Sequence, residues 1–206
     1  MDKMIFKTLE YEQEIELFLD KIENFTSVRL SKSYANSSTI VGVFLHNKLA
    51  GGYMLVTKPQ FRSLLFVPDS IKANNKFFNN DIYEMLEVNG VWLSPAIKTP
   101  KMQYKFWMKL VLDIFFSKKK YLLLMSNLKN KNIEYLHSLS NPEILYEGSP
   151  NLMAGEKSHD LIRVGYTTRW KAVLNIPKYW LELKNRERRA KTFEKQRQFN
   201  RSLSVS

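Results

Sequence analysis

Cysteine is absent from this chain of 206 residues, and long apolar runs are absent too. Without cysteine there is no disulfide framework, no thiolate metal site and no cysteine nucleophile. The most apolar window, residues 106–116, contains Lys109 and Asp113 and is too short to cross a bilayer. The first twenty residues are acidic and contain no apolar signal-peptide region. We therefore expect a cytoplasmic protein without a transmembrane segment.

Several sequence motifs that indicate a particular chemistry are also absent. The three histidines, His46, His137 and His159, do not form a His-Glu-x-x-His pair or another metal-ligand spacing. The chain has no P-loop, no glycine-rich dinucleotide fingerprint and no Gly-x-Ser-x-Gly nucleophile turn. These absences predict that the protein has no metal site.

The composition describes a folded protein with an excess of positive charge. Hydrophobic residues make up 44% of the chain and aromatic residues 13%, which is typical of a globular domain. The net charge is +12, and half of it lies in residues 176–206, which contain nine basic and three acidic residues. Such an asymmetry indicates either an anionic partner for the C-terminal segment or a basic tail.

Apolar spacing in the first half predicts mostly strands. Residues 4–10 are expected to form a strand, 11–24 an amphipathic helix and 27–38 a polar loop that has room for a short helix. Two apolar runs around His46-Asn47-Lys48 predict a β-hairpin. Residues 63–68 look like a continuation of its second strand, and the Asn-rich residues 70–81 like an exposed connection.

The second half alternates strands and helices. Strands are expected at 85–94, 121–126, 142–148 and 161–174, and helices at 101–117, 130–139 and from Pro177 onward. Asn89-Gly90 inside the first of these strands indicates a bulge. The order predicts a mixed α/β (α+β) domain over residues 1–175, with a largely antiparallel sheet and a central βα crossover. Residues 176–206 form a separate basic helix.

Residues 91–118 join an apolar strand to an apolar helix through a short turn. A strand-to-helix turn presents backbone N–H groups and the positive end of a helix dipole, which favour a phosphate group. This turn contains Lys98 and Lys101 but no glycine, and Pro100 has no N–H to donate. The turn therefore suggests an anionic ligand but lacks the residue that lets a backbone approach it closely.

The order of elements over about residues 3–174 resembles that of the GNAT superfamily of N-acetyltransferases. VGVFLHNKLAGGYMLV looks like strands two and three of that fold, and VWLSPAIKTPKMQYKFWMKLVLDIF like its fourth strand, cofactor turn and third helix. YLLLMSNLKNKNIEYLHSLSNPEILYEG looks like the fifth strand, the fourth helix and the sixth strand. The resemblance implies a GNAT-like sheet flanked by helices. It also implies an N-acyltransferase that moves an acyl group from acetyl-CoA or another acyl-CoA to an amine of a small molecule or protein.

The resemblance also implies which residues bind the cofactor. The family turn reads Arg/Gln-x-x-Gly-x-Gly/Ala; Lys98 falls at the basic position, and Lys101 and Gln103 fall at the glycine positions. Leu93, Met102 and Asn127 complete the expected cofactor contacts, with Asn132 as an alternative to Asn127. Two interpretations follow from the missing glycines: lysine side chains replace the backbone amides, or the pocket does not take coenzyme A.

For catalysis, the resemblance implies a general base on the fourth strand and an acid on the fourth helix. Glu87 is the preferred base and Glu84 the alternative, while a solvated carboxylate is the competing interpretation. Tyr135 matches the acid that protonates the leaving thiolate, and Tyr104 lies on the preceding helix. Tyr135 is equally consistent with a packed aromatic side chain that has a solvated hydroxyl.

The basic C-terminal helix leaves three interpretations open. It is a solvated helix, a nucleic-acid site in which Arg186, Arg188, Arg189 and Lys191 neutralise phosphates, or a docking element for an acidic protein or membrane surface. The function of the whole chain is correspondingly either an acyltransferase, a catalytically silent binding module in a protein or nucleic-acid assembly, or an acyltransferase that acts on nucleic acid or a protein bound to it.

Overall fold

The computed structural model describes residues 4–26, 29–150 and 161–203 of the chain. Within helices, the side chains of residues 132, 187, 190, 191, 193–195 and 197–203 lie outside this description.

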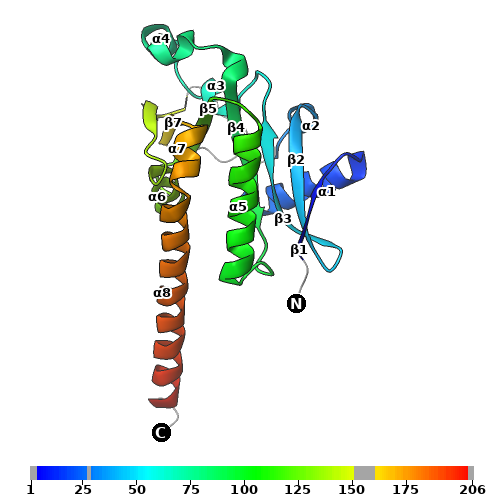
Figure 1. The fold of residues 1–206 in the computed structure, drawn as a ribbon, viewed down its shortest axis with the longest axis vertical. Coiled ribbons are helices and arrows are strands. Elements are labelled where there is room, and N and C mark those ends of the chain that lie inside the picture. The colour runs from blue at the N-terminus through cyan, green and yellow to red at the C-terminus, as the bar shows by residue number, and fades with distance from the viewer. Residues whose placement is uncertain (1–3, 27–28, 151–160, 204–206) are drawn as a thin grey trace.

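A seven-stranded sheet forms the centre of the protein, in the spatial order β1-β2-β3-β4-β5-β7-β6 (Figure 1). The strands are β1 (Met4–Thr8), β2 (Ser38–Leu45), β3 (Lys48–Val56), β4 (Met85–Leu93), β5 (Tyr121–Asn127), β6 (Glu143–Gly148) and β7 (Ile162–Thr168). All neighbours pair antiparallel except β4 and β5, which run parallel. The mixed α/β class and the largely antiparallel sheet are thus confirmed.

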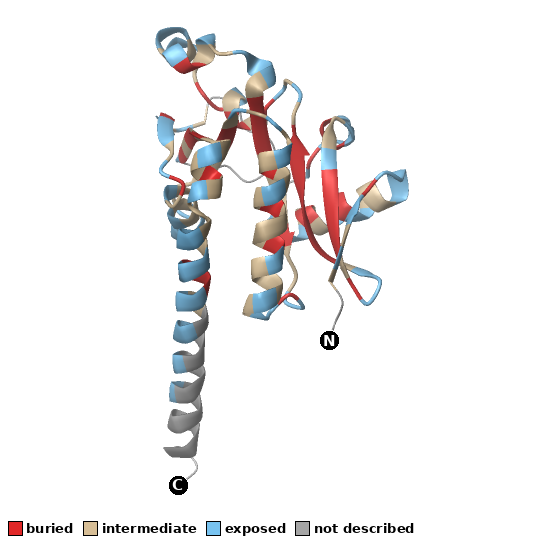
Figure 2. Ribbon diagram, viewed as in Figure 1, coloured by how far each residue is buried: buried red, intermediate tan, exposed pale blue. Residues whose placement is uncertain are grey.

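Helices cover both faces of this sheet. They are α1 (Glu12–Thr26), α2 (Lys32–Asn36), α3 (Arg62–Leu65), α4 (Asp69–Asn74), α5 (Pro100–Phe116), α6 (Lys131–Ser138), α7 (Arg169–Leu174) and α8 (Ile176–Leu203), with 3-10 turns η1 (Lys76–Asn79) and η2 (Ile82–Glu84). One core joins α1 and α2 to the sheet through Phe18, Ile22 and Tyr34. The other core joins α5 to the opposite face through Phe106 and Leu110, and Figure 2 shows the buried residues concentrated between these layers.

Two local features of the β2-β3-β4 region follow from residues with positive φ. His46 and Asn47 have φ of 49° and 60°, as a two-residue type I′ hairpin turn requires. In β4, Gly90 has φ of 58° and lies where the register with β3 shifts between Gly52 and Met54, so the predicted bulge is present. A Cβ atom at Gly90 would lie 2.6 Å from Cδ1 of Ile22, so glycine is required both by conformation and by space.

One predicted strand is wrong and another is shorter than predicted. Residues 63–68 do not continue β3: after Lys58-Pro59 the chain turns at Gln60, with φ of 91°, and forms the single helical turn α3. That turn brings Ser63 to a buried carboxylate instead of a sheet edge, because β4 already occupies the edge of β3.

The predicted strand 161–174 ends early. Its last residue in the sheet, Thr168, pairs with Tyr121, the first residue of β5, so the strand has no partner beyond that point. The Thr168 side chain then accepts a hydrogen bond from the Lys171 N–H and starts α7.

Helix α8 runs beside α5 and then continues beyond the rest of the protein (Figure 1). Its first turns contact the domain, where Leu183 and Glu182 are buried. Among the described residues, no helix is long and apolar enough to cross a membrane.

Candidate functional site

The central feature of the sheet is an opening between β4 and β5. These parallel strands pair only through Met85, Leu86 and Glu87, opposite Tyr121, Leu122 and Leu123. Beyond Glu87, β4 continues to Leu93 against β3, and β5 continues to Asn127 against β7, but no register pair joins β4 to β5. Among the described residues, the facing backbone edges are therefore not paired to each other beyond Glu87, which leaves room between them for an extended ligand.

Glu87 lies where the two strands separate, and its carboxylate is 4% exposed. Oε1 accepts hydrogen bonds from the Tyr34 hydroxyl at 2.8 Å and the Asn89 amide at 2.9 Å. Oε2 accepts from the Ser63 N–H at 3.0 Å and the Ser63 hydroxyl at 2.8 Å. The interpretation of Glu87 as a solvated carboxylate is wrong; it is a buried group that joins β4 to α2 and α3.

The groups around Glu87 are donors that stay protonated. Burial raises the pKa of Tyr34, and the neighbouring Glu87 carboxylate raises that pKa further. Tyr34 therefore stays protonated at neutral pH, and its hydroxyl donates a hydrogen bond to Glu87. The Asn89 amide also reaches the Tyr34 oxygen at 3.1 Å, so the three side chains form a closed polar cluster.

At the other end of β4, the turn into α5 displays two exposed lysines, Lys98 and Lys101. Thr99 caps α5 by accepting the Met102 N–H at 3.3 Å on its side chain and the Gln103 N–H at 3.0 Å on its carbonyl. Pro100 supplies no N–H. No described residue accepts a hydrogen bond from the N–H groups of Lys98, Thr99 or Lys101, which leaves these amides available to an anion.

The other predicted cofactor residues fall around the same opening. Leu93 ends β4, and Met102 and Gln103 lie in the first turns of α5, where the Gln103 amide donates to the Ile97 carbonyl at 3.2 Å. Asn127 ends β5, and its side chain accepts the Lys129 N–H at 2.9 Å in the turn before α6, whose N-cap is Asn130. The side chain of Asn132 is outside the described residues.

The predicted acid, Tyr135, lies on α6 with 47% of its surface exposed. Its hydroxyl lies near Glu182 of α8, a buried carboxylate, and helps to lower the pKa of that group. The alternative tyrosine, Tyr104 of α5, packs on Trp180 of α8 with ring centroids 4.6 Å apart. Both tyrosines thus contact the C-terminal helix.

Two of the four basic residues predicted to bind phosphate already have an acidic partner. Arg186 and Arg189 contact Oε1 of Glu182 at 2.8 and 2.9 Å. Together they hold the pKa of Glu182 below its usual value although burial alone would raise it. Arg188 is exposed, and the side chain of Lys191 lies outside the described residues.

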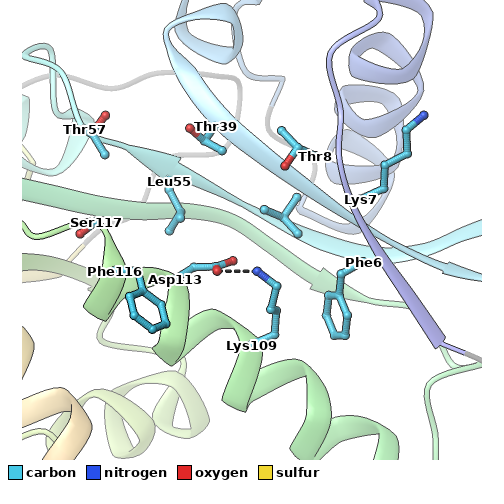
Figure 3. Close-up of a pocket in the computed structure, with 11 residues that line it drawn as sticks. Phe6, Lys7, Thr8, Thr39, Leu55, Thr57, Lys109, Asp113, Phe116 and Ser117 are labelled. Carbon is cyan, nitrogen blue, oxygen red and sulfur yellow. Dashed lines mark hydrogen bonds and ion pairs between the residues drawn. The ribbon is translucent and has the colours of Figure 1, made fainter.

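A separate pocket of about 280 Å³ lies between β1–β3 and the C-terminal half of α5 (Figure 3). Asp113 forms an ion pair with Lys109 there and accepts a hydrogen bond from Tyr53. The pocket extends to Phe116 and Ser117, whereas Lys98 precedes the other end of the helix. At 1.5 Å per residue these ends are about 25 Å apart, so this pocket is not part of the opening.

Sequence reasoning missed the three partners of Glu87. The sequence predicts a polar loop around Tyr34 and a strand at Ser63, and it indicates only a bulge at Asn89. Buried carboxylates need donors, so a predicted acidic residue in a central strand was a signal to search for them. Among the described residues, no cluster of three or more His, Asp or Glu is arranged to hold a metal ion.

Comparisons with solved structures identify this architecture. No family model matches the sequence, and no curated protein matches it. An N-acyl amino acid synthase from uncultured soil microbes superposes with a TM-score of 0.59 at 12% identity, over 84% of this chain and 94% of the other. The chain has the GNAT fold.

Two further solved structures agree with the GNAT fold. A ribosomal-protein alanine N-acetyltransferase from Escherichia coli superposes with a TM-score of 0.55 at 9% identity, over 81% of this chain and 94% of its own. A putative acetyltransferase of the GNAT family from Desulfovibrio desulfuricans gives 0.51 at 9%, over 81% and 99%. The expected superfamily resemblance is confirmed at the level of structure.

Proposed function

We propose that this protein is an acyl-CoA-dependent N-acyltransferase. The observation that carries the proposal is the separation of β4 and β5, with Glu87 at its closed end and Lys98 at its open end. The GNAT neighbours include enzymes named for transfer to an amino acid and to a protein alanine. An amine of a small molecule or protein is accordingly the proposed acceptor.

The opening fits an acyl-CoA in two respects. The separated edges of β4 and β5 offer backbone donors and acceptors to the amide-containing arm of the donor, apart from the Gly90 N–H, which already bonds to Asn89 Oδ1. The free amides of Lys98, Thr99 and Lys101, together with the two lysine side chains, offer positive charge to its phosphates. When bound, acyl-CoA supplies an activated thioester; Leu93, Met102, Gln103 and Asn127 are the proposed flanking contacts.

Glu87 is the proposed general base, which takes a proton from the attacking amine. All its described contacts are donors, so it accepts that proton only if one of them gives way. Asn89 is the candidate, because its side chain is partly exposed whereas Ser63 is buried. An amine that replaces the Asn89 amide at Oε1 would contact the base directly. Tyr135, which lies near Glu182, is the proposed proton donor to the leaving thiolate.

A catalytically silent binding module is the second candidate. Its support is the same fully bonded Glu87, which needs no catalytic role to explain its burial, and the missing glycines of the turn. An acyltransfer assay separates the two functions.

The experiment measures thiol release from acetyl-CoA and longer acyl-CoAs with amino acids, polyamines and a peptide with a free N-terminus. We expect at least one donor and acceptor pair to give turnover. Glu87→Gln is expected to lower that turnover by about 100-fold, the scale of a lost general base. Glu84→Gln, at the partly exposed alternative base just before the strand, is the matched comparison and is expected to keep turnover. Binding of acyl-CoA without any transfer would support the silent module instead.

A further inference from the structure

Helix α8 connects the two helices that follow the separated strands. Trp180 packs on Tyr104 of α5, which follows β4, and Glu182 lies near Tyr135 of α6, which follows β5. Tyr179 lies half-buried on the same helix, and this burial raises the pKa of its hydroxyl. The C-terminal helix is therefore fixed across the side on which α5 and α6 flank the opening.

A pocket of about 390 Å³ remains between α8 and the first turn of α5. Pro100, Tyr104, Trp180 and Leu183 form apolar walls, and the exposed Lys101 and Lys184 provide charge. This volume lies in the usual range of small-molecule sites, which combine apolar walls with a few polar groups. The pocket is built from both helices, so it exists only while α8 is docked.

The charge of this pocket is carried by side chains. No described carboxylate pairs with Lys101 or Lys184, and the Lys184 ammonium lies 4.5 Å from the centre of the Trp180 ring. The Met102 and Gln103 amides of the adjacent helix are occupied by Thr99. A ligand that satisfies the pocket needs a flat ring against Trp180 and a phosphate within reach of the two lysines.

We propose that this pocket binds the nucleotide end of the acyl donor, an adenosine carrying a 3′-phosphate. The inference rests on the proposed function. With the thioester inside the β4/β5 opening and the pyrophosphate at the Lys98–Lys101 turn, the nucleotide lies on the outer side of the turn, where α8 stands. Trp180 stacks on the base, and Lys101 and Lys184 bind the 3′-phosphate. The turn has no glycine to bring backbone amides close to the ligand. In this proposal, the Trp180 ring and the lysine ammonium groups supply part of that binding instead.

The test is calorimetric titration of the full chain with coenzyme A, 3′-dephospho-coenzyme A and adenosine 3′,5′-bisphosphate. Wild type is expected to bind coenzyme A about tenfold more tightly than the dephospho form. Lys184→Glu is expected to abolish that preference, and Trp180→Ala to weaken all three ligands about tenfold. Lys178→Glu, a charge change on the same helix but outside the pocket, is the matched control and keeps wild-type affinities.

The outcomes separate this inference from the proposed function. Wild-type affinity for coenzyme A in both pocket variants overturns the nucleotide site and leaves the acyltransferase standing. Binding of adenosine 3′,5′-bisphosphate that Lys184→Glu abolishes, in a protein with no acyl transfer, supports the nucleotide site and overturns the enzyme. No binding of any of the three ligands by wild type overturns both. Circular dichroism of Trp180→Ala verifies that α8 remains helical. If this variant loses helix, the binding data of the solvent-exposed Lys184→Glu variant decide the test.

Discussion

The two ends of the β4/β5 opening are built in opposite ways. At the closed end, Glu87 is buried and accepts hydrogen bonds from three residues on three different elements. At the open end, Lys98 and Lys101 are exposed and make no ion pair with a described residue. The closed end is determined by the folded structure itself. The open end has unsatisfied charge and amides, which a ligand can satisfy.

The difference teaches where stability and where binding are expected to reside. A buried carboxylate that loses its donors, or donors that lose their carboxylate, destabilise the fold strongly. Exposed lysines contribute little to stability but attract an anion over a distance comparable to the Debye length. Substitutions at the closed end should therefore change folding, and substitutions at the open end should change binding alone.

The largest expected effect is at Glu87. Glu87→Ala leaves the Tyr34, Ser63 and Asn89 donors without their acceptor, and we expect the free energy of unfolding to fall by about 3 to 5 kcal/mol. Urea unfolding measures it. Glu84→Ala, at an exposed position just before β4, should cost less than about 0.5 kcal/mol. Equal effects of the two variants would show that the closed end is not held by the Glu87 cluster.

Gly90, between the two ends, is next. Gly90→Val forces a branched side chain into a positive φ and toward Ile22, and we expect a loss of about 2 to 4 kcal/mol. Gly90→Asn tolerates that φ better and should cost less, since the steric contact then dominates. If thermal denaturation ranks the two variants the other way, the bulge is not under conformational constraint.

His137 on α6 predicts a pH dependence of stability. Burial lowers its pKa to about 4 from 6.5. Between pH 6.5 and 4, the imidazole is therefore protonated in the unfolded chain but not in the folded chain. The contribution of His137 to the free energy of unfolding is fully present above pH 6.5 and decreases as the pH falls toward 4. We expect His137→Gln to reduce the loss between pH 6.5 and 4.5 by about 1 to 2 kcal/mol. Urea unfolding at both pH values, with exposed His46→Gln as control, measures it; identical pH profiles for wild type and His137→Gln contradict the assignment.

Lys98→Glu sharpens the other half of the comparison. We expect about tenfold weaker binding of acetyl-CoA, which is about 1.4 kcal/mol, with the unfolding free energy changed by less than about 0.5 kcal/mol. Lys48→Glu, an equal charge change at the hairpin turn, is the control. A folding defect in Lys98→Glu would mean that the turn is structural, against the proposal that it binds a ligand.

The smallest effect concerns the basic helix. Because Arg186 and Arg189 are held by Glu182, binding of duplex DNA is expected to be weak and to depend on Arg188 among the described arginines. A plot of log affinity against log salt concentration has a negative slope. Arg188→Glu should make that slope less steep by about one to two. An unchanged slope in a filter-binding titration excludes this arginine from a nucleic-acid site.

Much of this fold was predictable because its signals are local. The His46-Asn47 turn, the Asn89-Gly90 bulge and the Pro100–Phe116 helix follow from residues adjacent in sequence. Residues 63–68 were not, because a short apolar run fits a strand and a buried helical turn equally well. The Glu87 cluster was not predictable either, since Tyr34 lies 53 residues away from it and Ser63 24. Nor did the sequence reveal that Trp180 would reach Tyr104.

Calorimetric titration of the full chain with acetyl-CoA tests the central claim most directly. We predict saturable binding with one site per chain, weakened about tenfold by Lys98→Glu and unchanged by Lys48→Glu. No heat and no thermal shift at millimolar acetyl-CoA would contradict the claim that the opening between β4 and β5 binds an acyl donor.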